Sequence, residues 1–178
     1  MSADHIEIRR LAQEDAADAV LYRDIRLEAL QANPEAFGST FEVENALPLS
    51  LFSDRLGSST VLGAFRDTEL VGIACFVVQQ GQKEAHKGTL WGMYVRPTAR
   101  NVKVGRRLVE AVCDHDRQQV ELIQLSVVLD NEPARSLYAR LGFPEYGVEE
   151  RSEASWPLLR RGSYGQGSLA AIKLGYPY

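Results

Sequence analysis

The stretch from Thr89 to Leu129 constrains the fold most, because its hydrophobic pattern changes from strand to helix and back to strand. Thr89 to Val95 is a β-rich run, and Glu121 to Leu129 alternates apolar with polar residues. Between the two runs, one helical face carries Val104, Leu108, Ala111 and Val112. Strands joined through a helical crossover run parallel in one sheet. The sequence therefore predicts a βαβ unit.

Further strand-like runs flank this unit on both sides. They are His5 to Leu11, Thr60 to Phe65, Leu70 to Gln79, Phe143 to Glu149 and Leu169 to Leu174. The two runs from Thr60 to Gln79 are separated by a short polar segment, which is typical of a hairpin. A parallel pair with antiparallel strands on either side predicts a mixed sheet flanked by helices, of the α/β or α+β class.

Three more helices are expected outside the crossover. The first has an apolar stripe and ends at Asn33-Pro34, because the residue before proline avoids the helical region. A second, short helix is expected between Pro34 and Ser53. The third starts at its N-cap Asn131 and stops at Gly142. The stripe of the first helix is assigned to Ala16, Val20, Leu27 and Leu30.

Charge and cysteine content argue against several classes of function. The chain has 178 residues, 20 basic and 24 acidic, and a net charge of −4, which does not favour nucleic-acid binding. Cys75 and Cys113 belong to no CxxC pair, so we expect buried thiols, no disulfide and no metal site. With no apolar stretch long enough to span a membrane, we expect no membrane partner and a cytoplasmic location. The length suits a single domain over residues 1–178.

The loop before the crossover helix is a candidate phosphate site. A helix N-terminus presents unpaired N–H groups and the positive end of the helix dipole, which together bind anions. Arg100, Lys103, Arg106 and Arg107 add positive charge around it. The alternative is an ordinary helix start with basic residues nearby by chance.

The segment from Asn131 to Phe143 is a second candidate. Asn131 is a helix N-cap on any interpretation, and Tyr138 alone is typical of a core tyrosine. However, this segment and the phosphate loop both follow strands of the parallel pair. Their loops therefore open at the same sheet edge, where ligands of such sheets bind.

These motifs together resemble the GNAT acetyltransferase superfamily over nearly the whole chain. The resemblance lies in Met93-Tyr94-Val95-Arg96-Pro97, in the loop from Arg100 to Gly105, and in Asn131, Ala134, Leu137-Tyr138 and Leu141-Gly142-Phe143. It implies the GNAT acyl-CoA N-acyltransferase fold. That fold has a mixed, mostly antiparallel sheet of about six or seven strands with a central parallel pair, flanked by about four helices.

The resemblance also implies acetyl-CoA as cofactor, held in a V-shaped gap between the two parallel strands. A bulge near Gly92 would splay the first of these strands. Tyr138 would act as general acid on the leaving thiolate, and a backbone N–H of the same strand would polarise the carbonyl. The residues implied in cofactor binding are Met93, Tyr94, Val95, Arg100, Asn101, Val102, Lys103, Val104, Gly105, Arg106, Asn131 and Tyr138.

The sequence says less about the residues that bind the acceptor amine. The family places its first helices over the acceptor, which makes Glu28, Phe37 and Glu42 candidate substrate residues. The first parallel strand carries no carboxylate, so the base is open between Glu28, Glu42, Glu44 and a water chain. All three glutamates also suit ordinary surface positions. Aromatic residues that would line an apolar part of the acceptor pocket are Phe41, Trp156 and Tyr164.

Two residues depart from the family pattern. Lys103 stands where the family's pyrophosphate loop has its first glycine, and Asn101 stands where a glycine is also common. Glycine allows close backbone approach to phosphate. The expected function is transfer of the acetyl group of acetyl-CoA to a primary amine of a small molecule or peptide. The alternative is a GNAT-like acyl-CoA-binding sensor with little or no turnover. A homodimer is a candidate assembly, since the family often pairs.

Overall fold

The computed structural model describes residues 5–116, 119–150 and 170–177, the last eight and residues 149–150 by their backbone alone. Their strands form one seven-stranded sheet in the order β1-β2-β3-β4-β5-β7-β6. Only the pair β4–β5 is parallel, as predicted for the βαβ unit, and the other neighbours are antiparallel. The strands are β1 (Ile6–Arg10), β2 (Thr60–Arg66), β3 (Glu69–Val78), β4 (Lys87–Val95), β5 (Leu122–Val128), β6 (Glu145–Glu150) and β7 (Ala170–Pro177).

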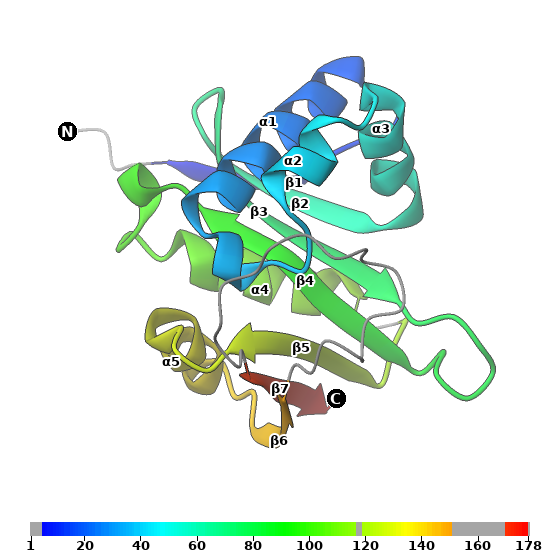
Figure 1. Cartoon of the computed structure of the whole chain (residues 1–178), viewed down its shortest axis with the longest axis vertical. Coiled ribbons are helices and arrows are strands. Elements are labelled where there is room, and N and C mark those ends of the chain that lie inside the picture. Colours follow the sequence, from blue (N-terminus) through cyan, green and yellow to red (C-terminus); the bar gives the residue numbers. More distant parts are fainter. Residues whose placement is uncertain (1–4, 117–118, 151–169, 178) are drawn as a thin grey trace.

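Helices cover both faces of this sheet (Figure 1). The helices α1, α2 and α3 lie over one face, and α4 packs on β1 to β4 from the other. The described residues form five α-helices, one more than the expected four or so. The helices are α1 (Ala16–Ala32), α2 (Phe41–Asn45), α3 (Leu49–Ser58), α4 (Val104–Asp116) and α5 (Glu132–Arg140), with short 3₁₀ turns at Pro34–Ala36 and Pro97–Ala99.

The core is divided between the two faces of the sheet. Alternate residues of β2 point to opposite sides, so Leu62 packs with Leu108 of α4 while Val61 packs with Tyr22 and Phe52 of α1 and α3. Both faces are therefore buried. This explains why β2 and β3 are almost continuously apolar.

Three predictions from the sequence need correction. The apolar stripe of α1 was partly wrong, because Ala16 and Val20 are exposed and the helix buries Tyr22, Ile25 and Arg26 instead. The segment before β2 forms α2 and α3 where one short helix was expected, since Pro48 starts a second helix. Cys75 is buried as expected, but Cys113 is only half-buried. No helix in the described residues has the length and apolar character to cross a membrane.

The parallel pair parts soon after it begins. The two strands pair at Lys87, Gly88 and Thr89 of β4, and no pairing with β5 continues beyond Thr89. On its other side β4 carries a bulge, since its register with β3 gains one residue between Trp91 and Tyr94. Gly92 lies in this bulge with a φ of 60°. The predicted bulge near Gly92 and the predicted gap between the parallel strands are thus both present.

Candidate active site

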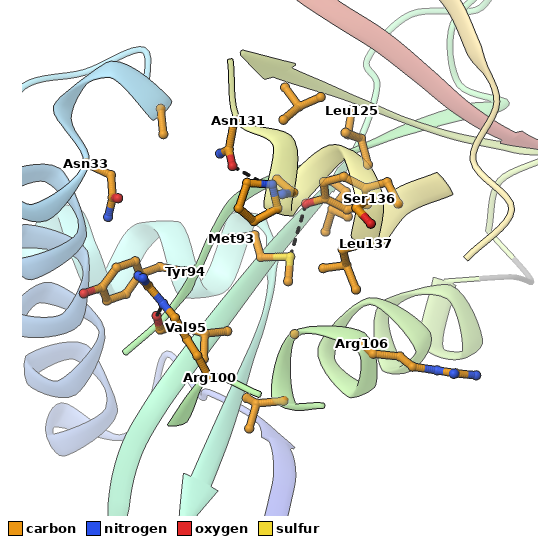
Figure 2. A pocket seen from close by; sticks show the side chains of 18 of the residues that line it. Asn33, Met93, Tyr94, Val95, Arg100, Arg106, Leu125, Asn131, Ser136 and Leu137 are labelled. Atoms are coloured by element: carbon orange, nitrogen blue, oxygen red, sulfur yellow. Dashed lines mark hydrogen bonds between the residues drawn. The ribbon is translucent and has the colours of Figure 1, made fainter. Parts of the chain in front are cut away.

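A cavity of about 930 Å³ opens where β4 and β5 part (Figure 2). Its walls come from the second half of β4, from β5, from the loop before α4 and from α5. A cavity at the carboxyl ends of parallel strands is the usual ligand site of such sheets. The predicted cofactor residues that line it are Met93, Tyr94, Val95, Arg100, Asn101, Lys103, Val104, Gly105, Arg106, Asn131 and Tyr138.

The loop before α4 ends in a helix start that has spare donors. The Lys103 carbonyl accepts the first helical bond, from the N–H of Arg107 at 3.0 Å. The N–H groups of Val104, Gly105 and Arg106 precede any intrahelical acceptor. A side chain at Gly105 would meet Met93, its Cβ lying 3.1 Å from the Met93 Cε. Gly105 thus keeps the helix start close to β4.

Two residues of this loop adopt the left-handed conformation. Asn101 has a φ of 65° and Lys103 a φ of 64°. Asparagine tolerates this region, whereas lysine rarely adopts it. The backbone thus keeps the conformation that favours glycine, although the sequence has replaced both glycines. Lys103 therefore places a side chain on a backbone conformation that favours glycine.

The arginines of the loop are exposed and point in different directions. The Nε of Arg100 donates to the carbonyl of Val95 at 3.1 Å, which keeps its guanidinium beside the end of β4. Arg106 pairs with Glu110 at 2.7 Å and extends away from the cavity in Figure 2. Arg100 is therefore the better placed of the two to meet an anion in the loop.

Tyr138 lies on the buried side of α5, beneath the gap. Its hydroxyl donates to the Met93 Sδ at 3.2 Å, and its ring packs edge-on against Phe143. The side chain is 6% exposed, and burial raises the pKa of the Tyr138 phenol well above its usual range. The phenol is therefore protonated at neutral pH and faces a sulfur atom.

Asn131 caps α5, as predicted. Its Oδ1 accepts from the N–H of Ala134 at 3.2 Å, and the residue also lines the cavity (Figure 2). Because the cap uses only the side-chain oxygen, the amide NH₂ remains able to donate.

The other end of the cavity lies under the C-terminal end of α1. Asn33, Ala36 and Phe37 line it from the α1 side, facing Trp91 and Gly92 of β4. Phe37 is thus a lining residue, as predicted, whereas Glu28, Glu42 and Val102 are not among the lining residues. Two of the three aromatic residues expected in the acceptor pocket, Trp156 and Tyr164, lie outside the described residues.

The three candidate bases have different surroundings. Glu28 accepts from the Tyr94 hydroxyl at 3.1 Å and pairs with Arg96 at 2.9 Å. Glu42 is exposed on α2. Glu44 is buried, and although burial favours a higher pKa, the hydrogen bonds and charges of Arg26 and Arg55 lower the pKa of Glu44 below its usual value. None of the described cavity-lining residues is a carboxylate or a histidine.

Sequence reasoning missed the β5 side of the cavity and the buried Arg26. The β5 residues Leu125 to Val128 line the cavity because β5 loses its partner there, which depends on the tertiary splay. Arg26 is 4% exposed on a helix, a place where the pattern of apolar residues gives no signal for an arginine. Glu44 accepts hydrogen bonds from both Arg26 and Arg55, and no other acidic residue accepts from two arginines among the described hydrogen bonds.

Solved structures with the same fold cover almost all of the chain. A GNAT-family acetyltransferase of Streptococcus pneumoniae has a TM-score of 0.76 and 20% identity, covering 97% of this chain and 99% of its own. The ribosomal-protein-alanine N-acetyltransferase of Brucella melitensis has a TM-score of 0.72 and 19% identity, over 97% and 99%. A Salmonella typhimurium protein solved with its cofactor acetyl-CoA has a TM-score of 0.72 and 17% identity, over 97% and 93%.

At these identities the likeness concerns the fold. A comparison with curated proteins finds no match. The family model for the acetyltransferase (GNAT) family, however, matches residues 23–143, from within α1 to the end of the α5 motif. This match spans well over half of the chain and includes the splayed strands, the α4 loop and Tyr138. The chain therefore belongs to the GNAT acetyltransferase family.

Proposed function

We propose that the protein transfers the acetyl group of acetyl-CoA directly to a primary amine of a small molecule or peptide. The observation that carries this proposal is the buried, protonated Tyr138 hydroxyl, which donates to a sulfur atom inside the gap between β4 and β5. A proton donor facing sulfur is what the departure of a thiolate requires.

The residues of the cavity fit acetyl-CoA in three ways. The splayed half of β4 offers backbone groups that no β5 residue pairs, and an extended pantetheine arm can bond to them as an added strand does. The start of α4 offers N–H groups and the positive end of the helix dipole to a diphosphate. The Tyr138 hydroxyl is a buried, protonated donor, and its present bond to the Met93 Sδ would be exchanged for one to the thioester sulfur.

In this proposal acetyl-CoA supplies an activated acetyl thioester. Backbone groups of Met93 and Val95 hold the pantetheine arm, and the amides from Arg100 to Gly105 hold the diphosphate. Asn131 donates its amide NH₂ to the arm. The amine nitrogen would bond to the acetyl carbon as the carbon–sulfur bond breaks. Tyr138 would give its proton to the leaving sulfur and recover one from solvent, while a β4 backbone N–H would stabilise the carbonyl oxygen.

We propose that water, and not a protein carboxylate, removes the proton of the amine. Among the described lining residues no carboxylate or imidazole reaches the cavity, and Glu28 and Glu44 are held in ion pairs. The rate should then rise with pH until the amine is fully deprotonated, without a plateau near neutral pH. A plateau near neutral pH that is lost in Glu28→Gln or Glu42→Gln would identify that glutamate as the base.

Thermal unfolding with acetyl-CoA, and with CoA for comparison, tests the cofactor site first. A ligand present at 100 times its Kd adds about 2.7 kcal/mol of stability. For a domain of this size the midpoint should rise by roughly 5–10 °C. Amines are then screened by the thiol that acetyl transfer releases. Absence of any shift at millimolar ligand would contradict the proposal.

The second candidate is an acyl-CoA sensor with little or no turnover. The observation that favours it is Lys103, whose side chain lies in the loop where the family has glycine. Binding of acetyl-CoA without thiol release in the presence of any amine would support the sensor. Turnover with one amine would exclude it.

The proposal also covers the domain organisation, the location and the assembly of the protein. We propose that residues 1–178 form a single catalytic domain, that the protein acts in the cytoplasm, and that it pairs as a homodimer. Light scattering checks the last point, because a dimer has twice the mass of the 19.8 kDa chain.

A further inference from the structure

A buried ion cluster lies beneath the α1 end of the cavity. Arg26 on α1 contacts Glu44 on α2 through two hydrogen bonds, its Nη2 at 2.8 Å and its Nε at 3.2 Å. Arg55 on α3 contacts the same carboxylate at 2.8 Å. The side chains of Arg26 and Glu44 are 5% and 2% exposed. The cluster thus holds three helices together.

The cluster carries one positive charge in excess. It contains two arginines and one glutamate, and the two titratable groups packed beside it are the Cys75 thiol and the Tyr22 phenol. Burial raises the pKa of the Cys75 thiol to about 11 and raises the pKa of the Tyr22 phenol, so both are neutral at neutral pH. Arg55 is 29% exposed, so water screens part of this excess, whereas Arg26 is buried next to the cavity. The remaining positive charge makes this end of the cavity favourable for an anion.

One nitrogen of Arg26 has no hydrogen-bond partner among the described residues. Its Nη1 is buried and makes none, whereas Nε and Nη2 are occupied by Glu44. The rings of Phe37 and Trp91 lie 4.9 and 5.7 Å from the Arg26 Cζ. The two aromatic rings attract the guanidinium as a whole, but they do not accept hydrogen bonds from the two N–H groups of Nη1 as an oxygen does.

The groups around Nη1 are also walls of the cavity. Phe37, Trp91 and Gly92 all line it. A Cβ placed on Gly92 would lie 3.6 Å from the Arg26 Nη1, so the missing side chain leaves the nitrogen next to the bulge of β4. Arg26 itself is not a lining residue, so a ligand in the cavity reaches Nη1 only when one of these walls, such as the half-buried Phe37 ring, moves.

We propose that the Arg26 Nη1 binds a carboxylate of the acceptor, and that the acceptor is an amino acid with both a primary amine and a free carboxylate. This inference rests on the proposed acetyl transfer. The carboxylate offsets the excess charge of the cluster and accepts hydrogen bonds from the unused N–H groups of Nη1. The charge of Glu44 does not oppose this carboxylate, because two arginines outweigh it.

The test compares amino acids with their own amides as acceptors. L-α-amino acids and ω-amino acids are assayed with the matching amides, which keep the amine and lack the carboxylate. A charge-assisted hydrogen bond at a buried site predicts that the acid is preferred about 10- to 100-fold in kcat/KM, mainly through KM. The amide has the more acidic ammonium group and more free amine at neutral pH, so amine ionisation does not explain such a preference.

Two matched variants show which arginine causes the preference for acids over amides. Arg26→Lys should lose it, because lysine keeps the charge but lacks the planar fork whose separate nitrogens face Glu44 and the β4 bulge. Arg55→Lys, a change of the same kind in the same cluster, should retain it, because Arg55 contacts Phe52 and not the cavity wall. If Arg26→Lys does not fold, the acid–amide comparison in the unaltered protein still decides.

Binding separates this inference from the proposed function. The unaltered protein is loaded with CoA, and its melting temperature is measured with each acid and each amide. Stabilisation by acids alone supports the carboxylate site even without turnover, in which case acetyl transfer is the part that fails. Equal turnover and equal stabilisation by acids and amides would overturn the inference and leave acetyl transfer standing.

Discussion

The two ends of the cavity are built in opposite ways. The end at α4 consists of backbone N–H groups and exposed arginines on a loop with two left-handed residues. The end at α1 consists of buried side chains, with Arg26 and Glu44 almost inaccessible. The first end offers donors to a ligand at little cost to the fold. The second end is part of what holds α1, α2 and α3 together.

This difference indicates at which end of the cavity ligand binding and unfolding stability depend on the same residues. Changes at the α4 end should alter acetyl-CoA affinity and leave unfolding nearly unchanged. Changes at the α1 end should alter unfolding first, since removal of one member of a buried ion pair leaves the others uncompensated. Acceptor preference would then be harder to change by mutation than cofactor affinity.

The largest expected effect is that of Glu44→Gln. It leaves two arginines without a counter-charge, and breaking a buried pair costs about 3–5 kcal/mol. The melting temperature should fall by roughly 10 °C, with acetyl-CoA affinity unchanged in the folded protein. The control is Glu69→Gln, which removes an exposed partner of Arg96 and should cost less than about 1 kcal/mol. Similar losses of melting temperature in both variants would contradict the expectation that the buried pair at the α1 end stabilises the fold.

The same pair predicts an acid limit. A carboxylate whose pKa is lowered on folding stabilises the protein above its unfolded pKa, and this contribution is lost as the pH falls through the folded pKa. The difference in unfolding free energy between the unaltered protein and Glu44→Gln should therefore shrink as the pH falls from the ordinary value of 4.5 through the lowered one. A constant difference over this range would show that the charge of Glu44 is not responsible.

Next in size is Tyr138→Phe, which tests the centre of the cavity. Loss of a general acid typically costs 100-fold or more, so kcat should fall by about 100-fold while the Kd of acetyl-CoA stays within about twofold. Steady-state kinetics and calorimetry check the two parts. Tyr146→Phe is the matched control, because its exposed hydroxyl contacts Gln124 outside the cavity and its removal should leave kcat unchanged. Unaltered turnover in Tyr138→Phe would assign the proton to solvent.

A smaller effect is expected from Lys103→Gly at the α4 end. Glycine relieves the left-handed strain of lysine, so the unfolding free energy should rise by about 1 kcal/mol, and acetyl-CoA should bind no more weakly. Asn101→Gly should change stability less, because asparagine tolerates the same conformation. A large loss of affinity in Lys103→Gly would show that the lysine ammonium pairs with the phosphates and that this end, too, depends on a side chain.

The smallest effect is that of Arg100→Gln. An exposed charge contributes about 0.2–1 kcal/mol, so acetyl-CoA affinity should fall by up to about fivefold while the melting temperature of the free protein stays the same. The loss should diminish at high salt, which screens exposed charges. A fall in melting temperature would show that the bond from Arg100 to the Val95 carbonyl stabilises the loop more than expected.

The sequence predicted the parts that depend on local pattern. The βαβ unit, the hairpin of β2 and β3, the cap at Asn131 and the bulge near Gly92 all follow from residues close together in the chain or from the family motif. The loop before α4 and the start of α4 line the cavity together for the same reason, since they are contiguous in the chain. Their roles in binding stay predictions.

The parts that depend on distant partners were missed. Arg26 finds Glu44 across 18 positions of sequence, and only the packing of α1 on α2 makes both of them buried. In the same way Val20 was placed on the buried stripe of α1, because an apolar residue says nothing of which face meets the sheet. The cavity lining on β5 depends on where the two strands part, which no local pattern records.

The short pairing of β4 with β5 leaves few backbone hydrogen bonds between two parts of the sheet, although one hydrophobic core spans both. Three positions of β4, Lys87 to Thr89, join a block of β1 to β4 to a block of β5, β7 and β6. The amides of β4 that face the gap beyond Thr89 should exchange their hydrogens rapidly in the free protein. A ligand that fills the gap as a strand would bond to these amides and slow their exchange.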